Sequence, residues 1–235
     1  MKTITTLISF IFIVNFSVGQ PGTLDSSFGV NGTLAIENFA KYVGCIKIQA
    51  DGKIIIGGES LLETILLARF NPDCSMDSTF GENGIVTTDL LPNYQLYYAF
   101  PRGMAIQPDG KIVITGSGYR DVGLYGDYDI FLARYNIDGS IDSSFGNNGI
   151  VTNDFGDDNE STSCISLQPD GKILTAGFYT FSSFAVRYYS NGTLDSSFNG
   201  IGWAKYNRGG FSSIIIQSDL KLILGGTNTE ESIQK

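Results

Sequence analysis

Histidine is absent from the 235-residue sequence, and tryptophan and cysteine are scarce, with one and three copies. The absence of histidine removes the usual general base of hydrolases, the Ser-His-Asp arrangement and the commonest metal ligand. The sequence also has no Gly-x-Ser-x-Gly motif, no phosphate-binding glycine loop after a strand and no paired-cysteine motif. We therefore expect a protein that is not an enzyme and that holds no cofactor and no metal.

The three cysteines are an odd number, so at least one of them has no partner within the chain. Cys45 and Cys164 each lie four residues before the glutamine of a repeated motif described below. Equivalent positions in separate repeats favour two buried small side chains over a disulfide.

Basic side chains are also few, because 15 lysines and arginines face 24 acidic residues and give a net charge of −9. Binding to nucleic acid requires clustered lysine and arginine at the phosphates, and here the basic residues are scattered. We therefore expect no nucleic-acid partner.

Long hydrophobic runs are missing beyond the N-terminus. Lys2 precedes a largely apolar run from Ile4 to Val18, which ends in the small residues Ser17-Val18-Gly19. This pattern predicts a signal peptide over residues 1–19, cleaved before Gln20, and a mature domain over 20–235 that is secreted or at the cell surface. A membrane anchor is the alternative, but the run is short for a bilayer span and no charged stop-transfer cluster follows it. We expect no stable membrane span elsewhere.

Internal repeats are the strongest feature that is present. One motif reads Leu-Asp-Ser-Ser-Phe-Gly at residues 24–29 and returns with small changes at 76–81, 141–146 and 194–199. A second reads Gln-Pro-Asp-Gly-Lys at 107–111 and 168–172, with relatives at 49–53 and 217–221. Between them lies Leu-Ala-Arg-Phe at 67–70, matched at 132–135 and 185–188.

The residues between these motifs have the pattern of short strands. Ile112–Thr115 is β-branched and closed by a glycine, and the preceding Gln-Pro-Asp-Gly segment is typical of a tight turn. Each unit therefore predicts a four-stranded antiparallel meander, which must pack against neighbouring units to bury its apolar faces. The expected fold is all-β, a β-propeller-like array of four-stranded blades with three full repeats and a partial fourth.

The three motifs in this fixed order resemble the delta-60 repeat family of exported bacterial proteins over nearly all of residues 22–226. The resemblance implies repeat architecture and export, and no known activity. Family arrays are usually longer, whereas this chain has units at roughly 43–88, 103–153 and 164–205, and a partial unit at 212–235. An N-terminal strand over 32–36 could complete the last unit and close a ring. The alternative, favoured by the short last strand, is that further repeats of a longer array complete it.

Residues that recur in every unit are interpreted as framework. We expect the repeated arginines and aspartates to form ion pairs or turn anchors within each unit, and the repeated phenylalanines to fill the core. These are Arg69, Arg134 and Arg187; Asp77, Asp142 and Asp195; and Phe28, Phe80, Phe145 and Phe198. Oxygen-bearing residues at alternate positions, 71–77 and 136–142, would also suit a calcium loop, but short Asp-Gly turns give the same letters.

A ligand-binding face is expected where the connections vary in length. Two long connections, 89–102 and 117–128, should meet at one end of the blades, flanked by 154–160 and 178–181. We predict that this face binds ligand through Tyr94, Tyr97, Tyr98, Phe100, Tyr119, Arg120, Tyr125 and Tyr128. Exposed tyrosines suit protein or glycan partners, and the alternative is that they pack on one another and only cap the fold.

Two functions follow from this face. The first is a non-catalytic binding or scaffold module that contacts protein or glycan at the cell exterior. The second is an exported hydrolase that acts on polysaccharide with loop carboxylates drawn from Asp121, Asp127, Asp154, Asp157 and Glu160.

Overall fold

The computed structural model describes residues 22–36, 38–121, 126–156, 159–180, 182–207 and 209–227. The predicted signal peptide, Tyr125, Asp157 and residues 228–235 lie outside these ranges. The chain divides into two compact units, residues 1–34 and 35–235, and each is described by itself.

The described part of the first unit is a tight turn. Val30 and Thr33 exchange backbone hydrogen bonds of 2.7 and 3.2 Å around Asn31 and Gly32, which both have positive φ. The strand expected over 32–36 does not form there, and residues 22–36 contain only isolated bridges, from Gly29 and Val30 to Thr33. In the complete repeats the equivalent segment pairs with the third strand of its own unit, and no such strand is found among residues 22–31.

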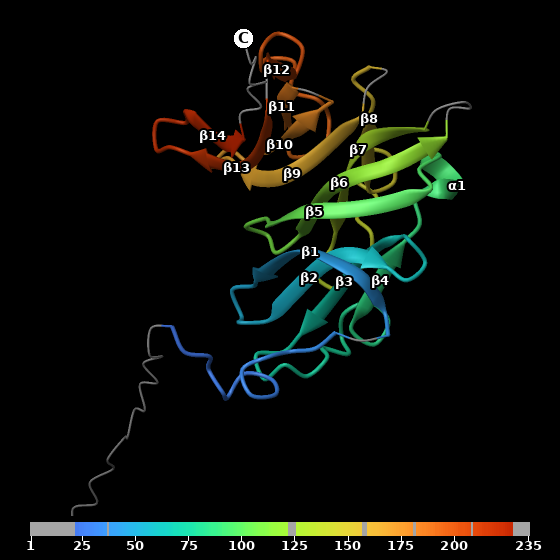
Figure 1. Ribbon diagram of the computed structural model, residues 1–235, viewed down its shortest axis with the longest axis vertical. Coiled ribbons are helices and arrows are strands. Elements are labelled where there is room, and N and C mark those ends of the chain that lie inside the picture. The colour runs from blue at the N-terminus through green and yellow to red at the C-terminus, as the bar shows by residue number, and fades with distance from the viewer. Residues whose placement is uncertain are drawn as a thin grey trace, which may run out of the picture. The chain divides into compact units, whose positions relative to one another are not determined.

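The second unit consists of antiparallel sheets (Figure 1). Blade 1 contains β1 (Ala40–Ile48), β2 (Ile54–Ser60), β3 (Ile65–Phe70) and β4 (Ile85–Thr88). Blade 2 contains β5 (Tyr98–Ile106), β6 (Ile112–Asp121), β7 (Gly126–Tyr135) and β8 (Ile150–Asn153). Blade 3 contains β9 (Glu160–Leu167), β10 (Ile173–Tyr179), β11 (Ser182–Tyr188) and β12 (Trp203–Asn207). Blade 4 has two described strands, β13 (Gly210–Ile216) and β14 (Leu222–Thr227), and a one-turn helix, α1 (Leu91–Tyr94), precedes blade 2.

The expected propeller-like order is confirmed by the contacts between sheets. The first strands of successive blades are neighbours, since β1 contacts β5, β5 contacts β9 and β9 contacts β13 (Figure 1). β2 and β3 are buried along their whole length, and both contact β5 of blade 2. Two apolar clusters fill the spaces on either side of blade 2, one centred on Phe131 and the other on Phe184.

The hairpin turns form as their sequence predicts. The Gln107 and Lys111 main chains close the turn before β6 with a 2.8 Å bond, and Gly110 occupies φ +83°. The Asp109 carboxylate accepts the Lys111 N–H at 3.2 Å, which is the self-bonding that favours aspartate in turns.

A β-bulge in the first strand of each blade explains the glycine within the second strand, which the sequence suggested would end it. The register of β5 against β6 shifts between Pro101 and Gly103, and Gly116 lies opposite this shift. A Cβ at Gly116 would collide with the Phe100 carbonyl oxygen, so only glycine fits.

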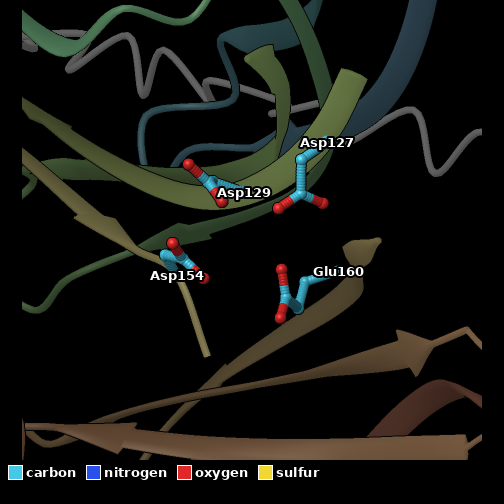
Figure 2. A group of neighbouring side chains, drawn as sticks. All are labelled: Asp127, Asp129, Asp154 and Glu160. Carbon is cyan, nitrogen blue, oxygen red and sulfur yellow. The ribbon is translucent and has the colours of Figure 1, made fainter. Parts of the chain in front are cut away.

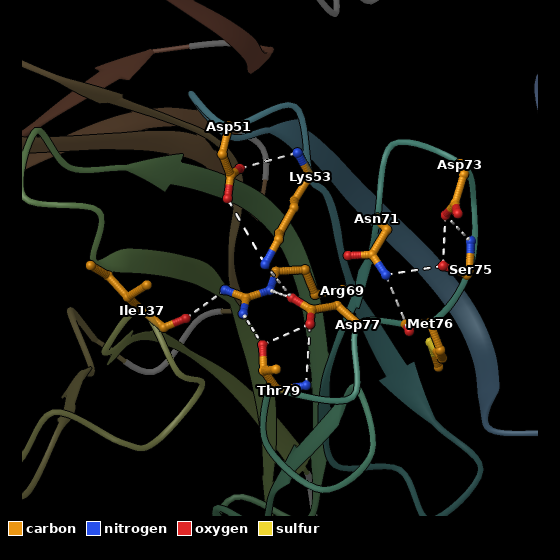
Figure 3. Close-up of polar contacts among 10 residues, drawn as sticks. All are labelled: Asp51, Lys53, Arg69, Asn71, Asp73, Ser75, Met76, Asp77, Thr79 and Ile137. Carbon is orange, nitrogen blue, oxygen red and sulfur yellow. Dashed lines mark hydrogen bonds and ion pairs between the residues drawn. The ribbon is translucent and has the colours of Figure 1, made fainter.

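The recurrent arginine and aspartate form the expected ion pairs. Arg69 Nε donates to Asp77 Oδ2 at 2.7 Å, and Lys53 Nζ donates to the same oxygen at 2.9 Å (Figure 3). Burial raises the pKa of Asp77, but hydrogen bonds from Lys53, Thr79 and Arg69 more than offset it and hold the pKa well below its usual range. The same pairs recur at Arg134–Asp142 and Arg187–Asp195, each at 2.7 Å.

These arginines also join neighbouring blades, which the repeats did not predict. Arg69 Nη1 donates to the Ile137 carbonyl of blade 2 at 2.5 Å, and its guanidinium carbon lies 4.5 Å from the Phe80 ring centre (Figure 3). Gly81 N–H donates to the Asp138 carbonyl at 2.7 Å. We call these contacts between neighbouring blades, from the arginine and from the backbone after the phenylalanine, the blade joint. Blades 2 and 3 have the same joint, in which Arg134 donates to the Ser190 carbonyl at 2.5 Å.

The joint decides which repeated phenylalanines are buried. Phe80 and Phe145 have no exposed surface, because the Asp-Gly or Asn-Gly turn of the next blade packs on each ring. Phe198 and Phe28 are only half-buried, so the expectation of four equivalent core residues is correct for two. Among the described residues no further turn packs on Phe198.

The cysteines form no disulfide among the described residues. Cys45 and Cys164 are half-buried at equivalent bulges, and each thiol lies 3.5 Å from a carbonyl oxygen, of Gly57 and Ala176 respectively. No helix in the described residues is long and apolar enough to cross a membrane.

Candidate functional site

The predicted aromatic residues lie mainly on strands and not in loops. The connections 89–102 and 117–128 extend the strands of blade 2: Tyr98 and Phe100 belong to β5, Tyr119 and Arg120 to β6, and Tyr128 to β7. Backbone register pairs Tyr98 with Tyr119 and Tyr119 with Tyr128, which places the three rings on one face of the sheet. The loop interpretation was wrong because blade 2 has longer strands than the repeat consensus suggests.

The rings of this face contact one another in a row. Tyr98 and Tyr119 have ring centres 5.7 Å apart, Tyr119 and Tyr128 5.4 Å, and Phe100 and Tyr128 6.0 Å. Tyr97 and Tyr98 stay exposed, at 47% and 38%, whereas Phe100, Tyr119 and Tyr128 are half-buried. The inner rings therefore pack on one another, as the alternative interpretation expected, and only Tyr97 and Tyr98 remain exposed enough to contact a partner.

An exposed aliphatic turn lies beside Tyr98. The turn between β2 and β3 is tied to β5 by a 3.0 Å hydrogen bond from Ala99 N–H to the Glu63 carbonyl. It carries Leu61 and Leu62, which are 57% and 82% exposed. We call Leu61, Leu62, Tyr97 and Tyr98 the exposed apolar end of blades 1 and 2. Sequence reasoning missed the two leucines, because the turn is short and blade 1 has no insertion there.

Tyr94 belongs to a different place. It lies on α1, and its hydroxyl donates to the Asn147 carbonyl at 2.6 Å. Burial raises the pKa of Tyr94. The residue lines a groove of about 1060 Å³ between the outer strand of blade 1 and blade 2, away from the row of rings.

Four carboxylates converge close to the aromatic row. Asp127 and Asp129 lie on β7, Asp154 follows β8, and Glu160 begins β9. One oxygen from each lies within 4.8 Å of the others, and Figure 2 shows Glu160 extending from β9 toward Asp127. We call these four residues the acidic cluster. Sequence reasoning named Asp127, Asp154 and Glu160 but not Asp129, because residue 129 lies just beyond the 117–128 connection that was expected to carry the site.

Arg120 is the nearest cation to the acidic cluster. Its Nη2 donates to Asp154 Oδ2 at 2.5 Å and to Asp129 Oδ1 at 3.2 Å, and it lies 3.8 Å from Asp127 Oδ2. The hydrogen bond from Arg120 to Asp154 is the largest of the effects that raise the pKa of the guanidinium. The arginine predicted as a ligand contact therefore bridges three carboxylates of this chain.

Glu160 has the most unusual environment of the four. Its side chain has no exposed surface, and neither carboxylate oxygen forms a hydrogen bond with a described residue. Burial first, and then the charges of Asp127, Asp129 and Asp154, raise the pKa of Glu160 to about 8, and the Phe155 backbone opposes this shift. Burial also raises the pKa of Asp129 to about 6, against the lowering effect of Arg120.

The turns considered for calcium use their oxygens internally. Asp73 and Asp138 each accept bonds from the serine two residues later, at 2.9 Å from its N–H. Asp77 and Asp142 are bound by arginine and lysine. Turn formation and ion pairing account for both patterns.

Comparison with known families agrees with the blade structure. A family model described as a domain of unknown function (DUF5122) beta-propeller matches residues 49–80, 107–145 and 168–198. Each match begins at the glutamine of a hairpin turn and ends at a repeated phenylalanine. The chain has a β-propeller-like repeat fold. No curated protein matches it.

The matched stretches separate framework from candidate site in this β-propeller repeat protein. Asp154, Glu160, Tyr97 and Tyr98 lie outside all three matched stretches. The second match is the longest, since it includes the extended β6–β7 hairpin with Arg120, Asp127 and Asp129. The aromatic row and the acidic cluster are therefore particular to blade 2 and its junction with blade 3, whereas the arginine–aspartate pairs recur.

Proposed function

We propose that this β-propeller repeat protein is an exported, non-catalytic binding module of the delta-60 type, and that its partner is a protein. Export is supported by the signal-peptide pattern of residues 1–19. The observation that carries the binding role is the exposed apolar end of blades 1 and 2, where Leu62 is 82% exposed beside the exposed Tyr97 and Tyr98.

The composition of this surface favours a protein partner over a glycan. Aromatic side chains are enriched in protein interfaces, and contiguous exposed apolar groups mark contact sites. Glycans stack on aromatic rings but gain little from branched aliphatic side chains such as Leu61 and Leu62. Tyr97 and Tyr98 lose few rotatable bonds on binding, and the ring of Tyr119 supports Tyr98 from behind.

The decisive variant is Leu62→Ser combined with Tyr97→Ser. Both side chains are exposed, so the melting temperature should be unchanged. A photo-crosslinking residue at position 98, in the cells that produce the protein, should capture a protein that the double variant no longer captures. The matched control is Ile201→Ser, an equally exposed apolar change in a different turn, which should leave capture intact.

Two results would contradict this function. If a photo-crosslinking residue placed at position 201 captures the same protein as one at position 98, the surface is not selective. Binding of the purified protein to immobilised glycans, lost in the double variant, would change the partner class to a glycan.

The second candidate, a polysaccharide hydrolase, is favoured by one observation. Glu160 has a pKa raised to about 8 beside aspartates, and such a difference between neighbouring carboxyls is typical of an acid and base pair. A catalytic acid must reach the glycosidic oxygen within hydrogen-bond distance, and both Glu160 oxygens are sealed from solvent. Cleavage of polysaccharide that is lost in Glu160→Gln would support the hydrolase against the binding module.

A further inference from the structure

The acidic cluster brings together oxygens from two blades. Asp127 and Asp129 come from β7 and Asp154 from the segment after β8, whereas Glu160 begins the first strand of blade 3. One oxygen from each residue lies within 4.8 Å of the other three (Figure 2). Like charges at this spacing repel, so the fold must supply compensation.

The compensation that the described residues supply to Glu160 is incomplete. Arg120 neutralises part of the charge through Asp129 and Asp154, and one guanidinium faces four carboxyl groups. Glu160 is fully buried, and neither of its oxygens has a hydrogen-bond partner among the described residues. A buried carboxylate in this condition costs several kcal/mol unless something else binds it.

Other buried carboxylates in the described chain show that Glu160 is an exception. Asp77, Asp142 and Asp195 each pair with an arginine and a lysine, and Glu59 pairs with Lys41 at 2.9 Å. These residues keep the usual rule that buried acids are paired. Glu160 differs from these residues in having no hydrogen-bond partner or ion pair among the described residues, which points to a positively charged ligand.

We propose that Asp127, Asp129, Asp154 and Glu160 bind a calcium ion at the junction of blades 2 and 3. The four oxygens lie within 4.8 Å of one another, and oxygens on one Ca²⁺ ion can be up to about 4.6–5.2 Å apart, twice the metal–oxygen distance. Mg²⁺ usually keeps several waters and takes only one or two carboxylates, so four convergent carboxyl groups favour calcium. Hard oxygen ligands without histidine or cysteine also suit calcium better than zinc.

The site has an entrance and a competing cation. The Asp154 side chain is 42% exposed, so an ion can reach the buried carboxylates past it. Arg120, 27% exposed, shares oxygens with the cluster and would have to turn toward solvent as the ion enters. The bound ion would tie the end of the β6–β7 hairpin to β9.

The test is a calcium titration of the full-length mature protein after removal of metal with a chelator. Calorimetry should detect one ion per chain at or below about 1 mM, where extracellular calcium modules operate, together with a higher melting temperature. Glu160→Gln and Asp154→Asn should each weaken binding at least about tenfold. Arg120→Gln should strengthen binding, because a competing positive charge is removed.

Two controls make the assignment specific. Glu82→Gln removes an exposed carboxylate outside the cluster and should leave calcium binding unchanged. Terbium, a calcium substitute, should give luminescence excited through Tyr128, the neighbour of Asp127 and Asp129, and this signal should disappear in Asp154→Asn.

Each remaining outcome overturns the proposal. If the wild type shows neither heat nor stabilisation with calcium, the cluster is a proton-sharing group of carboxyls. If Asp154→Asn binds as tightly as the wild type, the ion lies elsewhere. Should Glu160→Gln fail to fold, the exposed Asp154 still decides between these results.

Discussion

At the residue scale, the chain uses arginine in two ways. Arg69, Arg134 and Arg187 recur at one position of each unit and pair with a buried aspartate one turn later. Arg120 occurs once and faces several carboxylates at the edge of blade 2. Recurrence separated these roles in the sequence, because a framework contact is needed in every blade and a binding site is needed once.

Recurrence did not reveal that Arg69 and Arg134 also donate a hydrogen bond to a carbonyl of the next blade. The sequence predicted the arginine–aspartate pair, whose members lie eight residues apart. The Ile137 and Ser190 carbonyls that complete the arginine contacts lie more than fifty residues away. Every residue type has a main-chain carbonyl, so no particular residue marks the acceptor in the sequence. The hydrogen bond to the next blade was therefore not predictable from composition or spacing.

We expect Arg134→Met to destabilise the protein more than Arg187→Met. Both changes leave a buried aspartate with only a lysine, a loss of about 3 kcal/mol or more in the free energy of unfolding. Arg134 also bonds the Ser190 carbonyl at 2.5 Å, a charged hydrogen bond that adds about 1.5–3 kcal/mol. No such bond to a neighbouring blade is found for Arg187 in the described residues, and its side chain is more exposed.

Urea unfolding of the two variants measures this difference. Lys221→Met serves as the control, because that side chain is 76% exposed and should change stability little. Equal losses in the free energy of unfolding for Arg134→Met and Arg187→Met would show that the hydrogen bond to the Ser190 carbonyl contributes nothing to stability.

At the element scale, hairpin turns with the same sequence pattern have two different structural roles. Gly171 and Gly192 both follow an Asp or Asn in a turn and both have positive φ, +83° and +88°. The turn with Gly171 is open to solvent, and the nearest atom to a new Cβ there would be 3.7 Å away. The turn with Gly192 presses on Phe145 and Val151 of blade 2.

Strand lengths were the element-level feature that the sequence did not predict. Tyr119 and Arg120 were assigned to a loop because they lie beyond the apolar repeat core. In the structure β6 and β7 pair continuously from Ile112 to Asp121, since each polar residue has a cross-strand partner such as Tyr119 with Tyr128. Long-range pairing thus overrode the local polar pattern.

We expect Gly192→Ala to cost about 1–3 kcal/mol more than Gly171→Ala. Both substitutions place a Cβ at positive φ, and this common penalty of about 1–2 kcal/mol cancels in the comparison. At Gly192 the new Cβ would lie 2.8–3.0 Å from Val151 and Phe145, so the blade joint must open. Thermal and urea unfolding of the pair measures the excess, and identical penalties would show that the turn does not support the joint.

At the scale of the whole chain, the order of motifs predicted the blades because each motif marks one local structure. Turns and short apolar strands repeat in phase and form as expected in three successive sheets, while the repeated glycine lies within the second strand and not at its end. The meeting of Asp129 with Glu160 could not be predicted in this way, since it depends on how one blade packs on the next.

Successive packing also predicts that stability falls from blade 2 to blade 4. The central strands of blade 2 are buried between two neighbours, whereas in blade 4 Ile215 and Ile223 are 60% and 48% exposed. Local opening costs less where few apolar contacts are lost. We therefore expect amides of β6 to exchange with solvent deuterium at least about tenfold more slowly than amides of β13 and β14.

Hydrogen exchange followed by mass spectrometry would test this gradient, with β10 as an internal reference because blade 3 has neighbours on both sides. β10 should resemble β6, since both are second strands covered on two faces. Equal protection of β6, β10 and β14 would mean that the blades open in one cooperative step. The joints of Arg69 and Arg134 would then transmit stability along the whole array, and the nearest-neighbour description of this repeat protein would be wrong.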